Sequence, residues 1–473
     1  MEYRKRVAAV YLLGFFIDLA NLFVGNVAFP DIARTFHRDV AELAWVGTAY
    51  ILGLTAVIPL GNWLAARWGG KRVFVASLLL FMAGSAGAAQ AGSLGALIAW
   101  RALQGLGGGL LIPLGQTMTY RLYRPAERPG LTAMILLVGQ LAPALSPTLG
   151  GLALDALGWR WIFWLNLPLA IVPLVLALWW LRDEREPEPA AGLDWLGLLL
   201  GSLALLLALQ GLGDLAQPST WARGGALLAA GLALGAAYAR HSRRHPRPIL
   251  RLELLRDPLL RMSMLMYLLV PGAFMGVSLV AMLYLQQVLG VSASAAGLLM
   301  LPWSLGAFAA IALTGRGYRR LGPRPLLMAG PLAQGIGFLS LLAIDRSGQL
   351  PWLAGSYALM GLGGTLCSSA SQSTAFLGVA PARMGEASAL WNINRQVSFC
   401  VGMALACVLL NLLLAGQGIA DPGAPAAREL AVRAFHLCFL AAALAMLPPL
   451  WLGSRIGNAE VLRLLNRPQM GEA

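Results

Sequence analysis

Residues 61–72 read Gly-Asn-Trp-Leu-Ala-Ala-Arg-Trp-Gly-Gly-Lys-Arg, a basic stretch with a glycine pair that separates two apolar runs near residues 44–65 and 73–93. Each run is long enough for one helical crossing of a bilayer, since a hydrocarbon core of roughly 30 Å takes about 20 apolar residues. The stretch therefore predicts a tight, glycine-bounded basic turn between two membrane helices.

The same alternation of apolar runs and charged breaks continues along the chain. Candidate crossings lie near 7–29, 44–65, 73–93, 95–119, 131–154 and 161–181, then near 194–213 and 221–239, and finally near 262–288, 296–315, 325–344, 352–379, 388–414 and 432–453. We predict an all-α membrane protein with fourteen transmembrane helices. Residues 1–181 would form a six-helix bundle, 182–261 a linker with two extra helices and a basic cytoplasmic loop, and 262–473 a second six-helix bundle.

The composition of the chain agrees with a membrane protein. Of its 473 residues 58% are apolar and 12% are charged, and the mean hydropathy is +0.69. A water-soluble fold does not have this balance. The net charge of +14 does not indicate nucleic-acid binding, because that requires a basic face on a soluble domain and no loop is long enough to form one.

The basic residues predict the orientation instead. Alternate loops, beginning with the N-terminal segment, hold 26 of the 35 lysines and arginines, and only Arg101 and Arg395 lie within apolar runs. By the positive-inside rule this predicts that both termini are cytoplasmic. We expect a multi-pass protein of the bacterial inner membrane.

A weaker copy of the opening stretch returns at residues 315–324, in the matching loop of the last six helices. The opening stretch resembles the loop signature of the major facilitator superfamily, and the copy resembles the internal duplication of transporters of that kind. The resemblance implies the major facilitator fold. It also implies a gating loop at the cytoplasmic face, made of Gly61, Arg67, Gly69, Lys71 and Arg72.

Further motifs resemble the drug:proton antiporter branch with fourteen spanning helices. They are residues 101–107, 143–151, 158–168, 194–197 and 392–396. The proline and glycine pattern of Pro143, Pro147, Gly150 and Gly151 is similar to the fifth-helix pattern that marks exporters. The resemblance implies proton-coupled export of small hydrophobic or amphiphilic compounds, as in multidrug efflux.

The chain departs from that family pattern at four positions. Ala66 and Arg319 stand where an aspartate is usual in the two related loops, and Ser146 replaces a glycine of the fifth helix. Asn21 stands where the first helix usually has an acid, but Asp18 lies three residues earlier on the same helical face.

Asp18 is the acid closest to the predicted membrane midplane, about 16 Å along a helix that starts near Val7. An ionisable group at that depth costs at least a few kcal/mol and points to a function. We predict that Asp18 and Arg101 are the proton-coupling pair, and that protonation of Asp18 weakens their attraction and lets the two halves reorient. A structural hydrogen bond between helices is the alternative role for Asp18.

The remaining polar residues within spans predict a substrate cavity. Its candidates are Asn21, Asn26, Gln104, Gln140, Asn392 and Arg395. Candidates for apolar or aromatic contact with a hydrophobic substrate are Phe23, Tyr50 and Met134. For Arg395, pairing with backbone carbonyls is the alternative.

The sequence predicts no metal site and no cofactor. Its four cysteines lie in apolar stretches without ligand spacing, and we interpret His241 and His245 as part of a solvated basic loop. The expected partners are a small-molecule substrate, protons and the lipid bilayer, with no nucleic acid; a periplasmic adaptor is left open.

Three other functions are alternatives to multidrug export. The first is a dedicated exporter of one endogenous metabolite, which only a substrate screen separates from a multidrug exporter. The second is a membrane-embedded enzyme acting on lipid-linked substrates, which needs a cluster of acids, histidines or a nucleophile near a membrane face. The third is a sensor or scaffold, which predicts a sizeable soluble domain. Transport without enzymatic activity is therefore the prediction.

Overall fold

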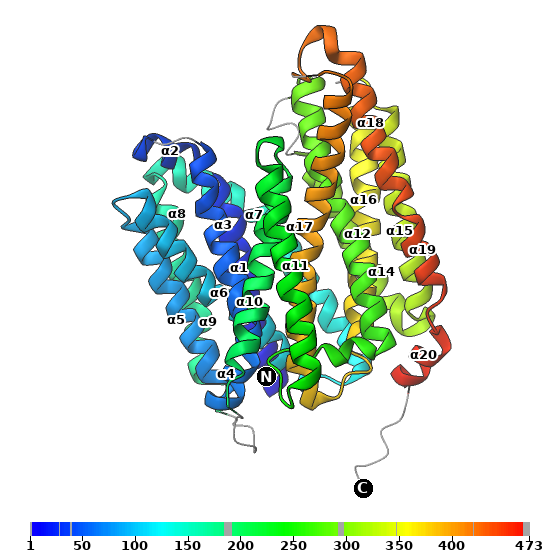
Figure 1. Ribbon diagram of the computed structural model, residues 1–473. Helices are drawn as coiled ribbons and strands as arrows, with labels where there is room; N and C mark the ends of the chain where they lie inside the picture. Colours follow the sequence, from blue (N-terminus) through cyan, green and yellow to red (C-terminus); the bar gives the residue numbers. More distant parts are fainter. Residues whose placement is uncertain are drawn as a thin grey trace.

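A computed structural model describes residues 2–27, 29–37, 40–183, 192–291, 298–346, 348–419 and 421–466, and the regular structure within these ranges is helical (Figure 1). Helices suit a bilayer because each one satisfies its own backbone hydrogen bonds where no water is available. Among the described residues, ten helices are long and apolar enough to cross a membrane by length and composition alone.

The first six predicted crossings form one helix set. Its members are α1 (Tyr3–Val27), α2 (Phe29–Phe36), α3 (Val40–Val57), a 3-10 turn (Ile58–Leu60), α4 (Gly61–Trp68), α5 (Gly70–Ala89), α6 (Leu94–Leu122), α7 (Arg128–Leu157), α8 (Arg160–Trp164) and α9 (Asn166–Trp180). We call α1 to α9 the first helix set. The second and sixth crossings are each built from more than one helical piece.

The other eight predicted crossings are also helical. They are α10 (Trp195–Leu215), α11 (Trp221–Arg244), α12 (Pro258–Leu283) with a π-helical turn (Tyr284–Val288), α14 (Met300–Leu321), α15 (Pro323–Ser340), α16 (Leu350–Ala375), α17 (Met384–Gly416), and α18 (Arg428–Leu444) with α19 (Leu447–Ser454). We call α12 to α19 the second helix set. A short helix, α20 (Asn458–Asn466), follows it. Each of the fourteen predicted apolar runs thus overlaps a helix within the residues that the structure describes.

The prediction of a turn across residues 61–72 was too long. Helix α4 continues the second crossing as far as Trp68, and the chain reverses at Gly69, whose φ is +87°. Within α4 no residue interrupts the helix before Gly69, whose positive φ glycine adopts readily because it has no Cβ atom. In the copied loop α14 likewise runs on to Leu321, and Gly322 turns the chain with φ +77°. The same glycine turn at matching places supports an internal repeat.

The two helix sets meet at the end of the molecule where α1 begins and α20 lies, which we call the termini end (Figure 1). The ring of Tyr120, near the end of α6, lies 5.0 Å from that of Phe376, which follows α16. Gln372 donates to the Tyr120 hydroxyl at 3.4 Å, and Arg128 donates to the Phe376 carbonyl. One buried apolar cluster draws on both sets here.

Toward the opposite end, the apolar clusters of the described residues each belong to one set. One cluster, around Ile32, Leu97 and Trp159, contains only residues of the first set. Another begins there around Tyr284 and Phe435 and extends along the second set as far as Leu465 in α20, and it contains only residues of the second set and of the segments beside it. The packing that joins the two sets is therefore concentrated toward the termini end.

Helix α10 packs on α11 and contacts α3 of the first set and α17 of the second (Figure 1). Ser202 of α10 donates to the carbonyl of Ala56 in α3 at 3.0 Å, and Asn411 of α17 donates to the carbonyl of Ala216 at 3.1 Å. Helix α10 thus bridges the two sets.

Candidate functional site

A cavity of about 210 Å³ lies between the two helix sets. Its wall is mainly apolar and includes the rings of Phe15, Tyr267, Phe274, Trp391 and Phe399. Polar side chains of the wall include Asp18, Gln116, Gln140, Gln372, Asn392, Arg395 and Gln396. Among the described lining residues only Asp18 and Arg395 carry a charge. An apolar pocket with a few convergent polar groups is the usual form of a small-molecule site.

Asp18 is almost fully buried, with 2% of its surface exposed. Its carboxylate accepts a hydrogen bond from the hydroxyl of Tyr50, which α3 holds fully buried. Helix α6 can approach this pair because residue 108 is glycine. A Cβ atom there would stand 2.5 Å from Asp18 Oδ1 and 2.7 Å from the Tyr50 hydroxyl.

Arg101 does not form a direct ion pair with Asp18 in the described structure. Its guanidinium donates to Gln104 Oε1 at 2.6 Å, to Asn21 Oδ1 at 3.2 Å and to the Val46 carbonyl at 3.2 Å. It also lies 4.3 Å from the centre of the Tyr50 ring. Tyr50 therefore connects the two residues, with its hydroxyl on the acid and its ring face on the cation.

Asn21 occupies an environment suited to an acid. Its Oδ1 accepts hydrogen bonds from Arg101, from Gln104 at 3.1 Å and from Asn166 at 3.0 Å, while its own buried Nδ2 has no hydrogen-bond partner among the described residues. Three donors on one oxygen are typical of a carboxylate acceptor. Asn21 and Gln104 were predicted to face the cavity, but they lie in this buried network and are absent from the described cavity wall.

The other predicted cavity residues divide in two groups. Gln140, Asn392 and Arg395 line the cavity, and Asn392 also donates to Gln116 Oε1 of the first set at 2.8 Å. Tyr50 is buried behind the wall, and Met134 is 42% exposed and does not line the cavity. These two predictions were wrong because the sequence of an apolar span has no periodicity that distinguishes the face toward the cavity from the face toward lipid, so the rotation of the helix about its axis could not be predicted. The side chains of Asn26 and Phe23 lie outside the described residues.

The residues predicted as a gating loop bind mainly within the first helix set. Gly61 begins α4 and Gly69 ends it. Arg67 stacks over Trp63, as its place on the same helix allows. Lys71 donates to the carbonyl of Leu178 at 2.7 Å, and Arg72 pairs with Asp183 at 2.7 Å, so both basic residues hold α5 to the end of α9.

A contact of this region with the second set comes from Asn62, which sequence reasoning missed. Gly385 at the start of α17 leaves room for the Asn62 carboxamide, because a Cβ atom there would collide with its oxygen. The only signal in the sequence was the position of Asn62 inside the basic stretch.

The four residues of the predicted antiporter pattern, Pro143, Pro147, Gly150 and Gly151, lie within the continuous helix α7, and their side chains lie outside the described residues.

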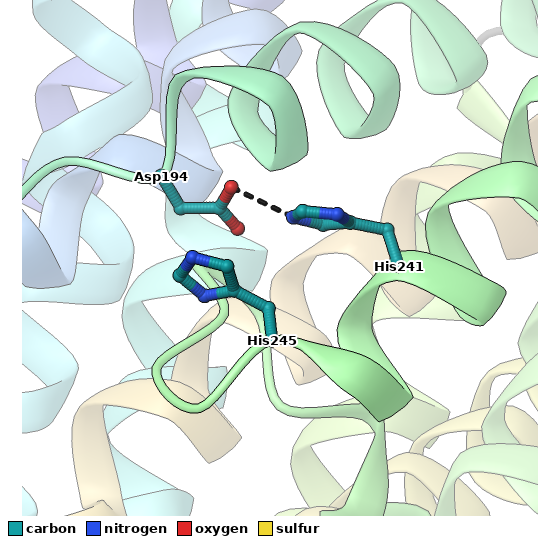
Figure 2. A group of neighbouring side chains, drawn as sticks. All are labelled: Asp194, His241 and His245. Carbon is teal, nitrogen blue, oxygen red and sulfur yellow. Dashed lines mark hydrogen bonds and ion pairs between the residues drawn. The ribbon is translucent and has the colours of Figure 1, made fainter.

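Figure 2 shows a cluster that the sequence did not predict, made of Asp194, His241 and His245. His241 lies in α11 rather than in a solvated loop, and its Nε2 is 2.8 Å from Asp194 Oδ1. Burial by itself would raise the pKa of the Asp194 carboxyl, but hydrogen bonds from the Gly197 N–H, His241 and the Ile249 N–H hold that pKa below its usual range. Asp194 lies before the first residue of α10, outside the spanning segment.

These three side chains bring potential metal-ligand atoms within 4.8 Å of one another. The Asp194 carboxylate already accepts three hydrogen bonds, and four arginines at positions 240, 243, 244 and 247 place positive charge beside the histidines. Such surroundings oppose a further cation. The hydrogen bonds of Asp194 hold the start of α10 against α11 and against the segment that follows α11.

Comparison with known proteins agrees with this geometry. Residues 11–403 match the model of the Major Facilitator Superfamily. The Multidrug resistance protein B homolog of Mycobacterium tuberculosis is 34% identical over 412 residues, which cover 86% of this chain and 76% of that protein. The putative multidrug resistance protein MdtD of Klebsiella pneumoniae is 29% identical, with 85% of each chain covered.

Among solved structures, the human organic anion transporter MFSD10 (TETRAN) superposes with a TM-score of 0.64 at 18% identity, covering 96% of this chain and 100% of that one. The proton:xylose symporter XylE superposes with a TM-score of 0.61 at 16% identity, covering 95% and 96%. The chain belongs to the major facilitator superfamily and has its all-helical fold.

Proposed function

We propose that this protein exports small hydrophobic or amphiphilic compounds in exchange for protons, by alternating access. The observation that supports this most directly is Asp18, a buried carboxylic acid that lines an apolar cavity between two helix sets. The names of the relatives, a multidrug resistance protein B homolog and a drug efflux pump, JefA, point to the same activity.

The surroundings of Asp18 suit reversible protonation. A buried carboxylate is expensive unless it is paired or hydrogen-bonded, and a positively charged substrate group that approaches it competes directly with a proton. Binding of either one then excludes the other, which is the linkage that antiport requires.

Asp18 and Arg101 would communicate through Tyr50. When Asp18 is ionised, it holds the Tyr50 hydroxyl; when it is protonated, that hydrogen bond weakens and the ring above Arg101 is released. Since Arg101 also binds Asn21 and Gln104, a change at Asp18 would reach α1 and α6 together.

We further propose that both termini are cytoplasmic, that the membrane is the bacterial inner membrane, and that the chain divides at residues 1–181, 182–261 and 262–473. The basic loops support this orientation. With it, the contacts of Tyr120 and Arg128 with Phe376 close the cytoplasmic side, so the arrangement described here is outward-facing. Opening to the cytoplasm would break these contacts.

A dedicated exporter of one endogenous metabolite is the second candidate, supported by the presence of a single acid in the cavity wall as described. A substrate screen separates the two. Membership of a transporter family supports transport rather than catalysis on lipid-linked substrates.

The test is reconstitution of the full chain in liposomes that contain a pH-sensitive dye. Lipophilic cations, anions and neutral compounds are added under an imposed proton gradient. We expect compound-dependent proton flux that disappears in Asp18→Asn and persists in Glu253→Gln, a matched change at a carboxylate of the surface. Sustained exchange by Asp18→Asn, or full export after the gradient is collapsed, would refute the proposal.

A further inference from the structure

The charges of the cavity wall suggest what kind of substrate it accepts. Arg395 of α17 lines the cavity opposite α1, and its guanidinium lies 5.8 Å from the centre of the Phe15 ring. It makes no hydrogen bond and no ion pair with any residue that the structure describes. An arginine in this state keeps its five N–H groups available, in a planar fork that fits a carboxylate or another oxyanion.

Asp18 offers the cavity a negatively charged hydrogen-bond acceptor. The Tyr50 hydroxyl binds its Oδ1, whereas its Oδ2 accepts no hydrogen bond from the described residues, and the residue lines the cavity. Asp18 and Arg395 are not in direct contact within the part of the chain that the structure describes. The cavity wall therefore presents one acceptor and one donor of opposite charge that do not touch each other.

A substrate with a single charge would use only one of these groups. A purely anionic substrate would also bind best when Asp18 is protonated, so that proton and substrate would favour each other, as in symport. A cationic group next to Asp18 displaces the proton, as antiport requires. The same cation alone would leave Arg395 without a partner in a mainly apolar cavity, which is unfavourable.

We propose that the preferred substrates are amphiphiles that carry both a cationic and an anionic group, with the cation beside Asp18 and the anion on the Arg395 guanidinium. The apolar part of the substrate lies between them, against the rings of Phe15, Trp391 and Phe399. This inference rests on the proposed function, whose substrate class it narrows, and it identifies Arg395 as the specificity-determining residue.

The test uses three compounds built on one phenylpropyl skeleton. The first, 4-(3-aminopropyl)benzoate, carries both charges; 3-phenylpropylamine carries only the ammonium group; and 4-propylbenzoate carries only the carboxylate. Their affinities for the purified full chain in detergent are measured by calorimetry. The compound with both charges is expected to bind at least tenfold more tightly than the amine, and the carboxylate alone to bind most weakly.

Variants then show whether Arg395 causes the preference. In Arg395→Gln the affinity ratio of the doubly charged compound to the amine should fall to about one, and Arg395→Lys should restore part of it. Arg346→Gln, at an arginine 83% exposed on the surface, should keep the ratio of the wild type. A ratio near one in the wild type, a ratio that survives Arg395→Gln, or no binding of any of the three compounds would overturn the inference.

Transport of the same compounds separates this inference from the proposed function. Proton-coupled export of the amine without any advantage for the doubly charged compound would leave the function intact and refute the substrate class. The expected charge preference in binding without proton-coupled flux would support the substrate class and refute antiport.

Discussion

Replacement of Tyr50 by phenylalanine tests whether the hydroxyl of this residue controls proton binding at Asp18. The change removes one oxygen and leaves the ring that lies 4.3 Å from the Arg101 guanidinium. A hydrogen bond to a buried charged group contributes about 1.5–3 kcal/mol. Since one pH unit corresponds to about 1.4 kcal/mol, the lost bond is equivalent to roughly one to two pH units.

The direction of the effect follows from which form of Asp18 the hydroxyl stabilises. The Tyr50 O–H donates to the carboxylate, so it favours the ionised acid, and its loss makes the proton bind more tightly. In Tyr50→Phe the pH at which exchange is half-maximal should therefore rise by roughly one to two units. A change that only damaged packing would lower the rate at every pH instead.

The assay is the initial rate of compound-driven proton flux in liposomes, measured between pH 5.5 and 9. The control is Tyr238→Phe, which removes a buried hydroxyl hydrogen-bonded to the Leu250 carbonyl, on the linker side of the molecule. This variant should keep the pH profile of the wild type. An unshifted profile in Tyr50→Phe, or a shift toward lower pH, would refute the proposed role of the hydroxyl.

Three further predictions concern neighbouring features. Gly108→Ala should disrupt the contact of Asp18 with Tyr50 and reduce exchange in the flux assay, because the added Cβ atom would overpack the site at a cost of about 1–3 kcal/mol. The control is Gly95→Ala on the same helix, where a Cβ atom meets open space, and this variant should behave as wild type. Asn21→Asp should give Arg101 a carboxylate partner, raising the apparent unfolding temperature and slowing exchange; a less stable protein with unchanged exchange would contradict this. The pKa of Asp194 is below its usual range, so its ionised form contributes stability above about pH 4 that is lost as the pH falls through the lower folded value. Unfolding temperatures of the wild type should fall in that acidic range, and those of Asp194→Asn should change less there.

Much of the fold was predictable because the responsible interactions are local. Each apolar run had to be a helix, since a backbone in lipid must satisfy its own hydrogen bonds. The predicted turn across residues 61–72 was too long, because most residues of that stretch fit a helix as well as a turn. Only the positive φ of Gly69 fixes where the helix ends. The position of Asp18 near the middle of its helix was also visible, since it depends only on the distance along that helix.

The partners of these residues depended on the tertiary structure. Tyr50 was expected to face the cavity, but the rotation of α3 places its hydroxyl on Asp18 and its ring on Arg101. His241 was expected in a solvated loop, but it lies against Asp194, 47 positions away. By itself the sequence therefore determined which segments form the long apolar helices and where along its helix Asp18 lies. Only the packed helices decided which side chains meet, because a span that is apolar on every face does not encode its own rotation.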